Sequence, residues 1–356
     1  MAGSATTATP SELNSKRMRG RGWRRIWTVA LPVGVIGGLI AADRSRLTSS
    51  VGALGHLDWV WLPLAVAAEA ASMSAFARTQ RRLIRAGGAN VHLGSVMAIT
   101  YAGNAISVSI PLAGPETATG FIYRNYSRLG IDPAVAGWAL AVSGGFSSLA
   151  FALVLAGGAA ASGTTSGMTV GIGGAAISLL LTVTVLIALR NSEVRRQLNR
   201  VVAHFIALSR RLVDRPGPET ADAIERFLDR VADLRLPRLQ YAEVMGLAVW
   251  NWVADCLCLA FSIRAVGVDV PWQGLVLAYG AGMAAASIGL TPGGLGVVEA
   301  VLSASLVALG IKGHSALAAV LVYRLISFWL VMTVGWAVVA VLTRGRSPQQ
   351  GGHNDP

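Results

Sequence analysis

Two stretches decide the fold: Ile110-Pro111-Leu112-Ala113-Gly114-Pro115-Glu116 and Leu290-Thr291-Pro292-Gly293-Gly294-Leu295-Gly296. Each is a Gly/Pro break inside an apolar segment, and the two lie 180 positions apart in similar surroundings. At this offset Ala98, Ala105, Ser107, Gly114, Leu129-Gly130-Ile131, Ala136 and Ala139 fall on Ala278, Ala285, Ser287, Gly294, Leu309-Gly310-Ile311, Ala316 and Ala319. Such a matched pair of interrupted apolar segments is typical of a transport site in a membrane protein.

Composition predicts an all-α polytopic membrane protein. Apolar residues make up 53% of the chain and charged residues only 13%, and a bilayer core of about 30 Å needs about 20 apolar residues per helix. We expect full spans at 26–42, 58–77, 133–160, 168–189, 241–265 and 315–343. Six crossings place both ends of the chain on the same side of the membrane.

The formal net charge of +12 arises from arginines in short segments between the predicted spans. This pattern indicates the positive-inside signal of membrane topology and argues against a nucleic-acid partner. Only Lys16 and Lys312 are lysines, which together with the Ala and Gly richness suggests a GC-rich bacterial genome. We therefore expect a multi-pass protein of the bacterial inner membrane, with both termini cytoplasmic.

The terminal segments and the cysteines indicate which features this membrane protein is expected to lack. Residues 1–25 read as a retained basic cytoplasmic tail and 344–356 as a polar, disordered cytoplasmic tail. Cys256 and Cys258 are the only cysteines, and their spacing inside an apolar helix supports neither a disulfide framework nor a metal site. No cofactor, catalytic constellation or metal site is expected.

The basic clusters constrain the two broken segments, within a transmembrane domain of 26–343. If the arginine-rich segments are all cytoplasmic, segment 91–132 begins and ends inside and segment 271–312 begins and ends outside. The broken segments then enter from opposite faces, which makes 58–160 and 241–343 the units of an inverted-topology repeat. A pair of complete spans in place of each broken, re-entrant hairpin is the alternative.

Residues 191–238 form a linker between the two units. Apolar residues recur there at helical spacing, with arginines on the complementary positions of the first helix. Two interpretations remain open: an amphipathic helix on the anionic cytoplasmic leaflet, or a helical hairpin packed on the membrane domain.

Each break also predicts a helix start that points at the centre of the protein. Gly114 would be the N-cap with Pro115 at the first helical position, and Gly294 would precede the second start at Leu295. Unpaired N–H groups and the positive end of the helix dipole suit a phosphate or carboxylate. The breaks are therefore candidate anion sites within the bilayer.

Ionisable residues at membrane depth are functional candidates because burial of charge is costly. We expect seven there: Glu69, Glu116, Arg124, Arg128, Asp255, Glu299 and Arg324. Arg324 could hold a phosphate, or form a structural pair with Glu299 or Asp255. Glu116 and Glu299 could exchange protons, or bond to turn N–H groups and pair with Arg124 or Arg324. Glu69 and Asp255, with Asn251, are weaker candidates, and Asn104 and Ser107 could simply pack helices.

A family resemblance rests on Thr291-Pro292-Gly293-Gly294-Leu295-Gly296-Val297-Val298-Glu299, then Tyr323-Arg324-Leu325 and the aromatic end Phe328, Trp329, Gly335 and Trp336. This sequence resembles the integral-membrane family typified by the flippase part of lysyl-phosphatidylglycerol synthase/flippase proteins. The resemblance covers roughly 26–343. The family's first polar motif would fall on Asn104, Pro111, Gly114, Glu116 and Arg124, with Pro115 as a departure between the glycine and the glutamate.

The resemblance implies movement of a modified phospholipid or polyprenyl-linked lipid between leaflets, without the soluble aminoacyltransferase domain and hence without lipid synthesis. Membrane lipids are the expected partners. The implied translocation residues are Arg324, Glu299, Pro292, Gly293, Gly294, Gly296, Gly114, Glu116, Arg124 and Asn104. Two other functions remain open: a secondary transporter of a small soluble anion, and a non-transporting scaffold or regulator of an envelope-synthesis enzyme.

Overall fold

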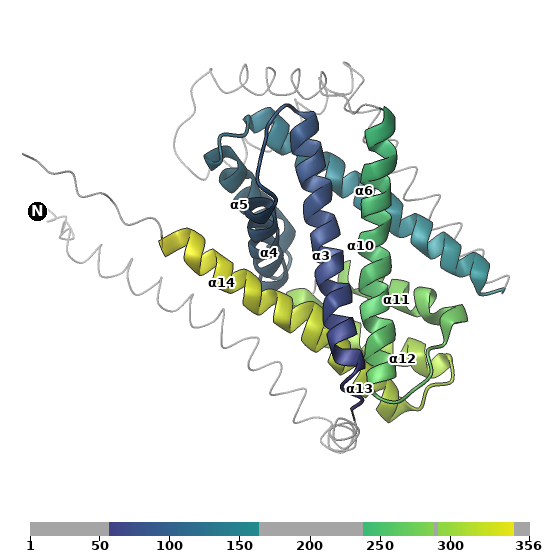
Figure 1. The fold of residues 1–356 in the computed structure, drawn as a ribbon. Helices are drawn as coiled ribbons and strands as arrows, with labels where there is room; N and C mark the ends of the chain where they lie inside the picture. Colours follow the sequence, from purple (N-terminus) through teal and green to yellow (C-terminus); the bar gives the residue numbers. More distant parts are fainter. Residues whose placement is uncertain (1–56, 164–237, 288–290, 345–356) are drawn as a thin grey trace, which may run out of the picture. The chain divides into compact units, whose positions relative to one another are not determined.

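A computed structural model describes residues 57–163, 238–287 and 291–344 (Figure 1). Several predicted segments lie outside these residues: the tail 1–25, the spans 26–42 and 168–189, the linker 191–238 up to its last residue, and the tail 344–356 after its first residue. The described chain is helical, which confirms the predicted all-α class.

Two sets of helices follow one another in the same order. The first comprises α3 (Trp61–Ala86), α4 (Leu93–Ser109), α5 (Gly114–Arg128) and α6 (Pro133–Ala161). The second comprises α10 (Arg238–Ala265), α11 (Trp272–Ser287), the short 3-10 helix η1 (Pro292–Gly294), α12 (Val297–Ala308), α13 (Gly313–Arg324), the π-helix η2 (Leu325–Leu330) and α14 (Val331–Arg344). The offset of 180 seen in the sequence thus brings α3 onto α10, α4 onto α11, α5 onto α12 and α6 onto α13–α14.

The corresponding helices α3 and α10 run antiparallel and lie side by side (Figure 1). The backbone N–H of Asp58, before α3, donates to the carbonyl of Ala265 at the end of α10 over 2.8 Å. At the other end, Arg82 pairs with Glu243 over 2.6 Å. Because equivalent helices run in opposite directions, the two units form an inverted repeat, as the sequence predicted.

The later helices of each repeat pack on helices of the other repeat. Helix α4 packs on α14, and its counterpart α11 packs on α6. Both contacts place a glycine where a larger residue would collide: a Cβ on Gly280 would lie 2.1 Å from Leu155, and a Cβ on Gly335 would lie 2.3 Å from the carbonyl oxygen of Tyr101. Gly335 is the counterpart of Leu155 at the offset of 180. The glycine therefore lies on α11 in the contact of α11 with α6, but on α14, the counterpart of α6, in the contact of α4 with α14.

Three helical stretches in the described residues are long and apolar enough to cross a membrane: 133–161, 240–265 and 313–343. They coincide with three of the predicted spans. The predicted span 58–77 lies in α3, but that helix continues through the arginine cluster to Ala86. It ends there because Gly87 and the positive-φ Gly88 follow, which stop a helix more effectively than exposed arginines do.

The helices flanking each break are short. Helix α4 has 17 residues and α5 has 15, whereas α11 has 16 and α12 has 12. At about 1.5 Å per residue these lengths reach about 18 to 26 Å, less than the hydrocarbon core of about 30 Å. The lengths favour broken hairpins over pairs of complete spans.

Candidate functional site

The second break is shaped by three glycines that adopt positive φ: 56° at Gly293, 69° at Gly294 and 84° at Gly296. Only glycine enters this region without steric cost. Pro292 opens the short helix η1, and the hydroxyl of Thr291 donates to the carbonyl of Leu295 over 2.9 Å. Helix α12 therefore begins at Val297, three residues after Gly294, and the start predicted at Leu295 is wrong because the chain first makes this extra turn.

The carboxylate of Glu299 occupies the start of α12. Its Oε2 accepts a hydrogen bond from the backbone N–H of Gly296 over 2.6 Å, and its Oε1 accepts one from Nε of Arg324 over 2.7 Å. A negative group at a helix N-terminus is stabilised by free N–H groups and by the helix dipole. The chain's own carboxylate thus lies where the sequence suggested an external anion.

Arg324 is the last residue of α13 and directly precedes the π-helix η2. Besides Glu299, its guanidinium donates to the carbonyl of Gly293 over 2.7 Å and lies 4.4 Å from the ring centroid of Phe328. The side chain is only 9% exposed. Of the two predicted roles for Arg324, this geometry is that of a structural pair with Glu299 that fixes the break, and the phosphate role stays a prediction.

The first break uses different residues for the same task. Leu112 is the one non-glycine residue with positive φ in the described chain, at 60°. A Cβ on Gly114 would lie 1.9 Å from the carbonyl oxygen of Ser107, so only glycine permits this close approach of α5 to α4. Helix α5 begins at Gly114 with Ala113 as N-cap, one residue earlier than predicted, and Pro115 lies in its first turn, where a missing N–H costs nothing.

Two predicted site residues beside the first break are not buried. Helix α5 buries Gly114, Ala118, Asn125 and Tyr126, whereas Glu116 and Arg124 are on its exposed side. Glu116 and Arg124 do not share the packed face of the helix, and their part in translocation stays a prediction. Asn104 lies instead at the contact of α4 with α3, where its amide approaches the sulfur of Met73 at 3.5 Å.

A second polar cluster lies between the two repeats, on α3 and α10. The carboxyl groups of Glu69 on α3 and Asp255 on α10 face each other one turn from the Ser72–Asn251 contact and interact electrostatically, and we call these two residues the acid pair. Asp255 also accepts hydrogen bonds from the hydroxyls of Tyr279 over 2.7 Å and Tyr323 over 2.9 Å. Tyr323 immediately precedes Arg324, so the acid pair is next to the second break.

Glu69 is 7% exposed, and its Oε2 has no hydrogen-bond partner among the described residues. The sequence ranked both acids, which are 186 positions apart, as weaker candidates. The repeat could have predicted their contact. When equivalent helices of an inverted repeat pack antiparallel, a residue before the middle of one helix meets a residue after the middle of the other, as Glu69 meets Asp255.

A cavity of about 590 Å³ opens beside the first broken hairpin. Its polar lining includes His92, Ser95, Asn125 and Arg128, and its apolar lining includes Ala98, Ile99, Leu129 and Leu342. These residues come from the first turns of α4 with its N-cap, from the end of α5, and from α14. The site therefore joins elements of both repeats and offers polar and apolar contacts together.

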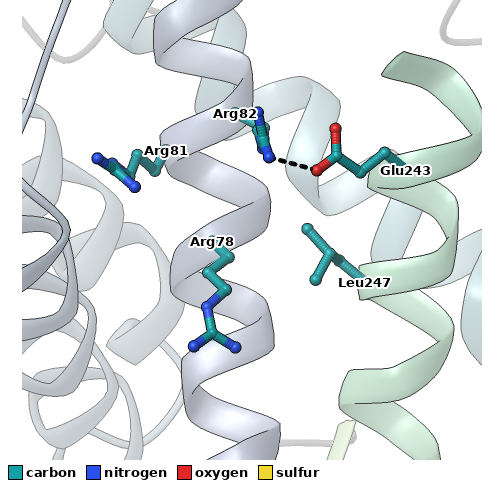
Figure 2. A pocket seen from close by; sticks show the side chains of 5 residues that line it. All are labelled: Arg78, Arg81, Arg82, Glu243 and Leu247. Carbon is teal, nitrogen blue, oxygen red and sulfur yellow. Dashed lines mark ion pairs between the residues drawn. The ribbon is translucent and has the colours of Figure 1, made fainter. Parts of the chain in front are cut away.

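A smaller cavity of about 170 Å³ lies between the arginine-rich end of α3 and the start of α10. Figure 2 shows Arg82 directed at Glu243, with Arg78 and Arg81 on neighbouring turns of α3. The side chains of Arg82 and Glu243 are 46% and 40% exposed. A pair so open to solvent contributes little to stability.

The fold and these sites define an all-α membrane protein built from an inverted repeat with a broken helix pair in each half. The described residues contain no group of three His, Cys, Asp or Glu side chains arranged to hold a metal ion. Residues 27–335 match the family described as the lysylphosphatidylglycerol synthase TM region, and the chain belongs to that family.

Two relatives are similar to parts of the chain. A UPF0104 membrane protein of Pyrococcus horikoshii is 34% identical over 116 residues, which are 33% of this chain and 35% of the relative. A UPF0104 membrane protein of Methanothermobacter thermautotrophicus is 29% identical over 89 residues, 25% of this chain and 27% of the relative. The matches thus cover about a third of each relative's length, or less.

Proposed function

We propose that this protein is a lipid translocase that moves a modified phospholipid or a polyprenyl-linked lipid between the leaflets of the bacterial inner membrane. The observation that carries the proposal is the cavity of about 590 Å³ beside the first broken hairpin. It lies in an inverted repeat, the architecture in which one half rocks against the other to alternate access.

The cavity has the two kinds of lining that a lipid needs. Arg128, His92 and Asn125 offer hydrogen-bond donors to a phosphate or sugar head group. Ile99, Leu129 and Leu342 offer apolar contact to the first methylene groups of an acyl or prenyl chain. A small soluble anion would not use this apolar wall, and the volume is within the usual range of ligand pockets, about 300 to 1,000 Å³.

The second break does not line the cavity but contacts one of the helices that do. Helix α4, which lines the cavity, also contacts η1 at the second break. In this proposal Pro292, Gly293, Gly294 and Gly296 give the second break its shape, while Glu299 and Arg324 hold it. Gly114 lets α5 approach α4, and Arg124 lies one helical turn before Arg128, so it can attract a head group toward the cavity.

The proposal assigns movement of a lipid to this chain and no chemical reaction on it. It places both termini in the cytoplasm and includes an envelope-synthesis enzyme as a possible supplier of the lipid. The support for this orientation is the arginine-rich end of α3, which joins the smaller cavity.

The test is leaflet exchange in liposomes that contain the purified protein. Fluorescent phosphatidylglycerol, lysyl-phosphatidylglycerol and a polyprenyl-phosphate sugar serve as probes. Exchange above that of empty liposomes, reduced by Arg128→Ala but not by Arg85→Ala, supports the proposal. Arg85 is a matched control because it lies on exposed α3 surface, bonded to Asn90 over 3.3 Å.

Arg324→Ala and Glu299→Gln are measured in the same assay, and a reduced rate of exchange in either variant shows that the second break takes part in lipid movement. No exchange of any probe by folded wild-type protein contradicts translocation. Uptake of a soluble anion such as phosphate would then identify a secondary transporter, and its absence would leave the scaffold function.

A further inference from the structure

We propose that the acid pair is a proton-binding site, and that movement of the two repeats against each other loads and releases its proton. The second part rests on the proposed function, because it makes the proton gradient the energy source of lipid movement. The first part is a property of the folded protein alone and can be tested without transport.

Two ionised carboxyl groups that face each other in a buried contact repel, so a proton on one of them relieves the repulsion. Asp255 receives two hydrogen bonds, from Tyr279 and Tyr323, and these stabilise its ionised form. Glu69 has no such donors: its Oε2 is buried without a partner among the described residues. A charge there would be buried and uncompensated, so the proton belongs to Glu69.

Among the described residues, the groups around the acid pair include a single cation, which is already bonded elsewhere. Ionisable groups that act on the pair come from several elements: Cys256 and Cys258 on α10, Tyr101 on α4, Tyr279 on α11, and Tyr323 and Arg324 on α13. Arg324 is the only cation in this set, and it acts electrostatically on Asp255. Its guanidinium is already hydrogen-bonded to Glu299 and Gly293.

The position of the acid pair links it to movement. Glu69 belongs to the first repeat and Asp255 to the second, so any sliding of α3 along α10 changes the distance between them. The hydroxyl of Ser72 donates to the side-chain oxygen of Asn251 over 3.2 Å, one turn away. When the repeats move apart and water reaches Glu69, its O–H bond breaks, the proton passes to water, and a carboxylate remains on Glu69.

The first experiment is infrared spectroscopy of the purified full-length protein at neutral pH. A protonated carboxyl gives a carbonyl band that an ionised carboxyl lacks. We expect this band in the wild type and in Glu243→Gln, which alters an exposed acid of α10, and its loss in Glu69→Gln. A band that persists unchanged in Glu69→Gln, or is absent from the wild type, overturns the site. Stabilisation of the wild type by Na⁺ that Glu69→Gln abolishes, together with an absent band, would show a sodium site instead.

The second experiment imposes a pH gradient on liposomes holding the protein and fluorescent phosphatidylglycerol. The readout is the ratio of net lipid movement with the gradient to movement without it. We expect this ratio to exceed one in the wild type and in Glu243→Gln, and the gradient effect to be lost in Glu69→Gln. An infrared band without any lipid movement contradicts the proposed function but keeps the proton site. Lipid movement that ignores the gradient, with the band present, refutes the coupling.

Discussion

Arg324 and Glu299 are joined by a hydrogen-bonded ion pair of 2.7 Å between Nε and Oε1 that closes the second break across 25 residues of chain. The other oxygen of Glu299 holds the start of α12 and the other arm of Arg324 holds the carbonyl of Gly293. The pair therefore acts on three elements at once: α12, α13 and the turn between α11 and α12. Its loss should disturb the whole break rather than one helix.

Glu299→Ala should lower the free energy of unfolding by about 3 kcal/mol, because it leaves Arg324 buried without its carboxylate. Glu299→Gln should cost less, since the amide oxygen can still accept one hydrogen bond. The control is Glu243→Ala, whose pair with Arg82 is 46% and 40% exposed and should contribute only about 0 to 1 kcal/mol. Thermal unfolding in detergent followed by tryptophan fluorescence compares them, and equal losses would contradict a structural role for the Arg324 pair.

Leu112→Gly should raise the free energy of unfolding by about 0.5 to 1 kcal/mol. Leu112 adopts φ of 60°, a left-handed conformation that costs a residue with a Cβ about 1 to 2 kcal/mol, and the extra freedom of glycine in the unfolded chain offsets part of this gain. Its side chain is 76% exposed, so little burial is lost. Val60→Gly, at φ of −64° and 71% exposed, is the control that should not gain stability. A loss of stability in Leu112→Gly would show that the leucine makes a contact with lipid or detergent that outweighs the strain.

Gly335→Ala should destabilise the protein more than Gly280→Ala. The new methyl group at 335 would meet a backbone carbonyl, that of Tyr101, at 2.3 Å, whereas the one at 280 would meet the end of the Leu155 side chain at 2.1 Å. A side chain can turn aside and backbone cannot, so we expect about 1 to 3 kcal/mol at 335 and less at 280.

Leu155→Ala provides the second test of this difference. Combined with Gly280→Ala it should restore part of the lost stability, because it removes the atoms that collide. The same change combined with Gly335→Ala should restore nothing. Thermal unfolding of the two double variants decides between these outcomes, and rescue of both would mean that the two contacts do not pack as described.

Arg128→Ala should weaken binding of an anionic lipid about tenfold, the effect of losing one hydrogen bond between a charged donor and a phosphate. Fluorescence quenching of labelled phosphatidylglycerol in detergent micelles measures this affinity. The wild-type affinity should fall with added salt and that of Arg128→Ala should fall less steeply, because one cation is missing. Equal affinities would place the head group outside the cavity that Arg128 lines.

The sequence predicted the parts of the fold that repeat and missed those that occur once. Apolar length located three of the long helices, and the offset of 180 positions predicted the inverted repeat, because both depend on patterns that extend over many residues. The π-helix after Arg324 has no counterpart in the first unit. Such a bulge depends on local packing, here of Phe328 against Arg324 and Gly293, and leaves no period in the sequence.

In the candidate site, too, some features could be predicted from the sequence and others could not. Glycines and prolines predicted both breaks, since backbone conformation dictates those residue types. The surroundings of the charged residues were harder to predict: Glu116 and Arg124 lie on the exposed side of α5, and Glu69 faces Asp255 across the repeats. Hydrophobicity alone does not tell which face of a short polar helix packs, or which of several acids meet in space.

The acid pair also lies off the centre of the repeat. At the offset of 180, Ser72 is equivalent to position 252, next to its partner Asn251, so the pseudo-two-fold axis passes beside that contact. The positions related to Glu69 and Asp255 by this axis are Ala75 and Val249, both apolar. In a molecule with perfect two-fold symmetry the inward-open and outward-open conformations would have equal energy. If the protein alternates access as proposed, a polar contact on one side of the axis alone would make the two conformations unequal in energy and would give the protein a resting side.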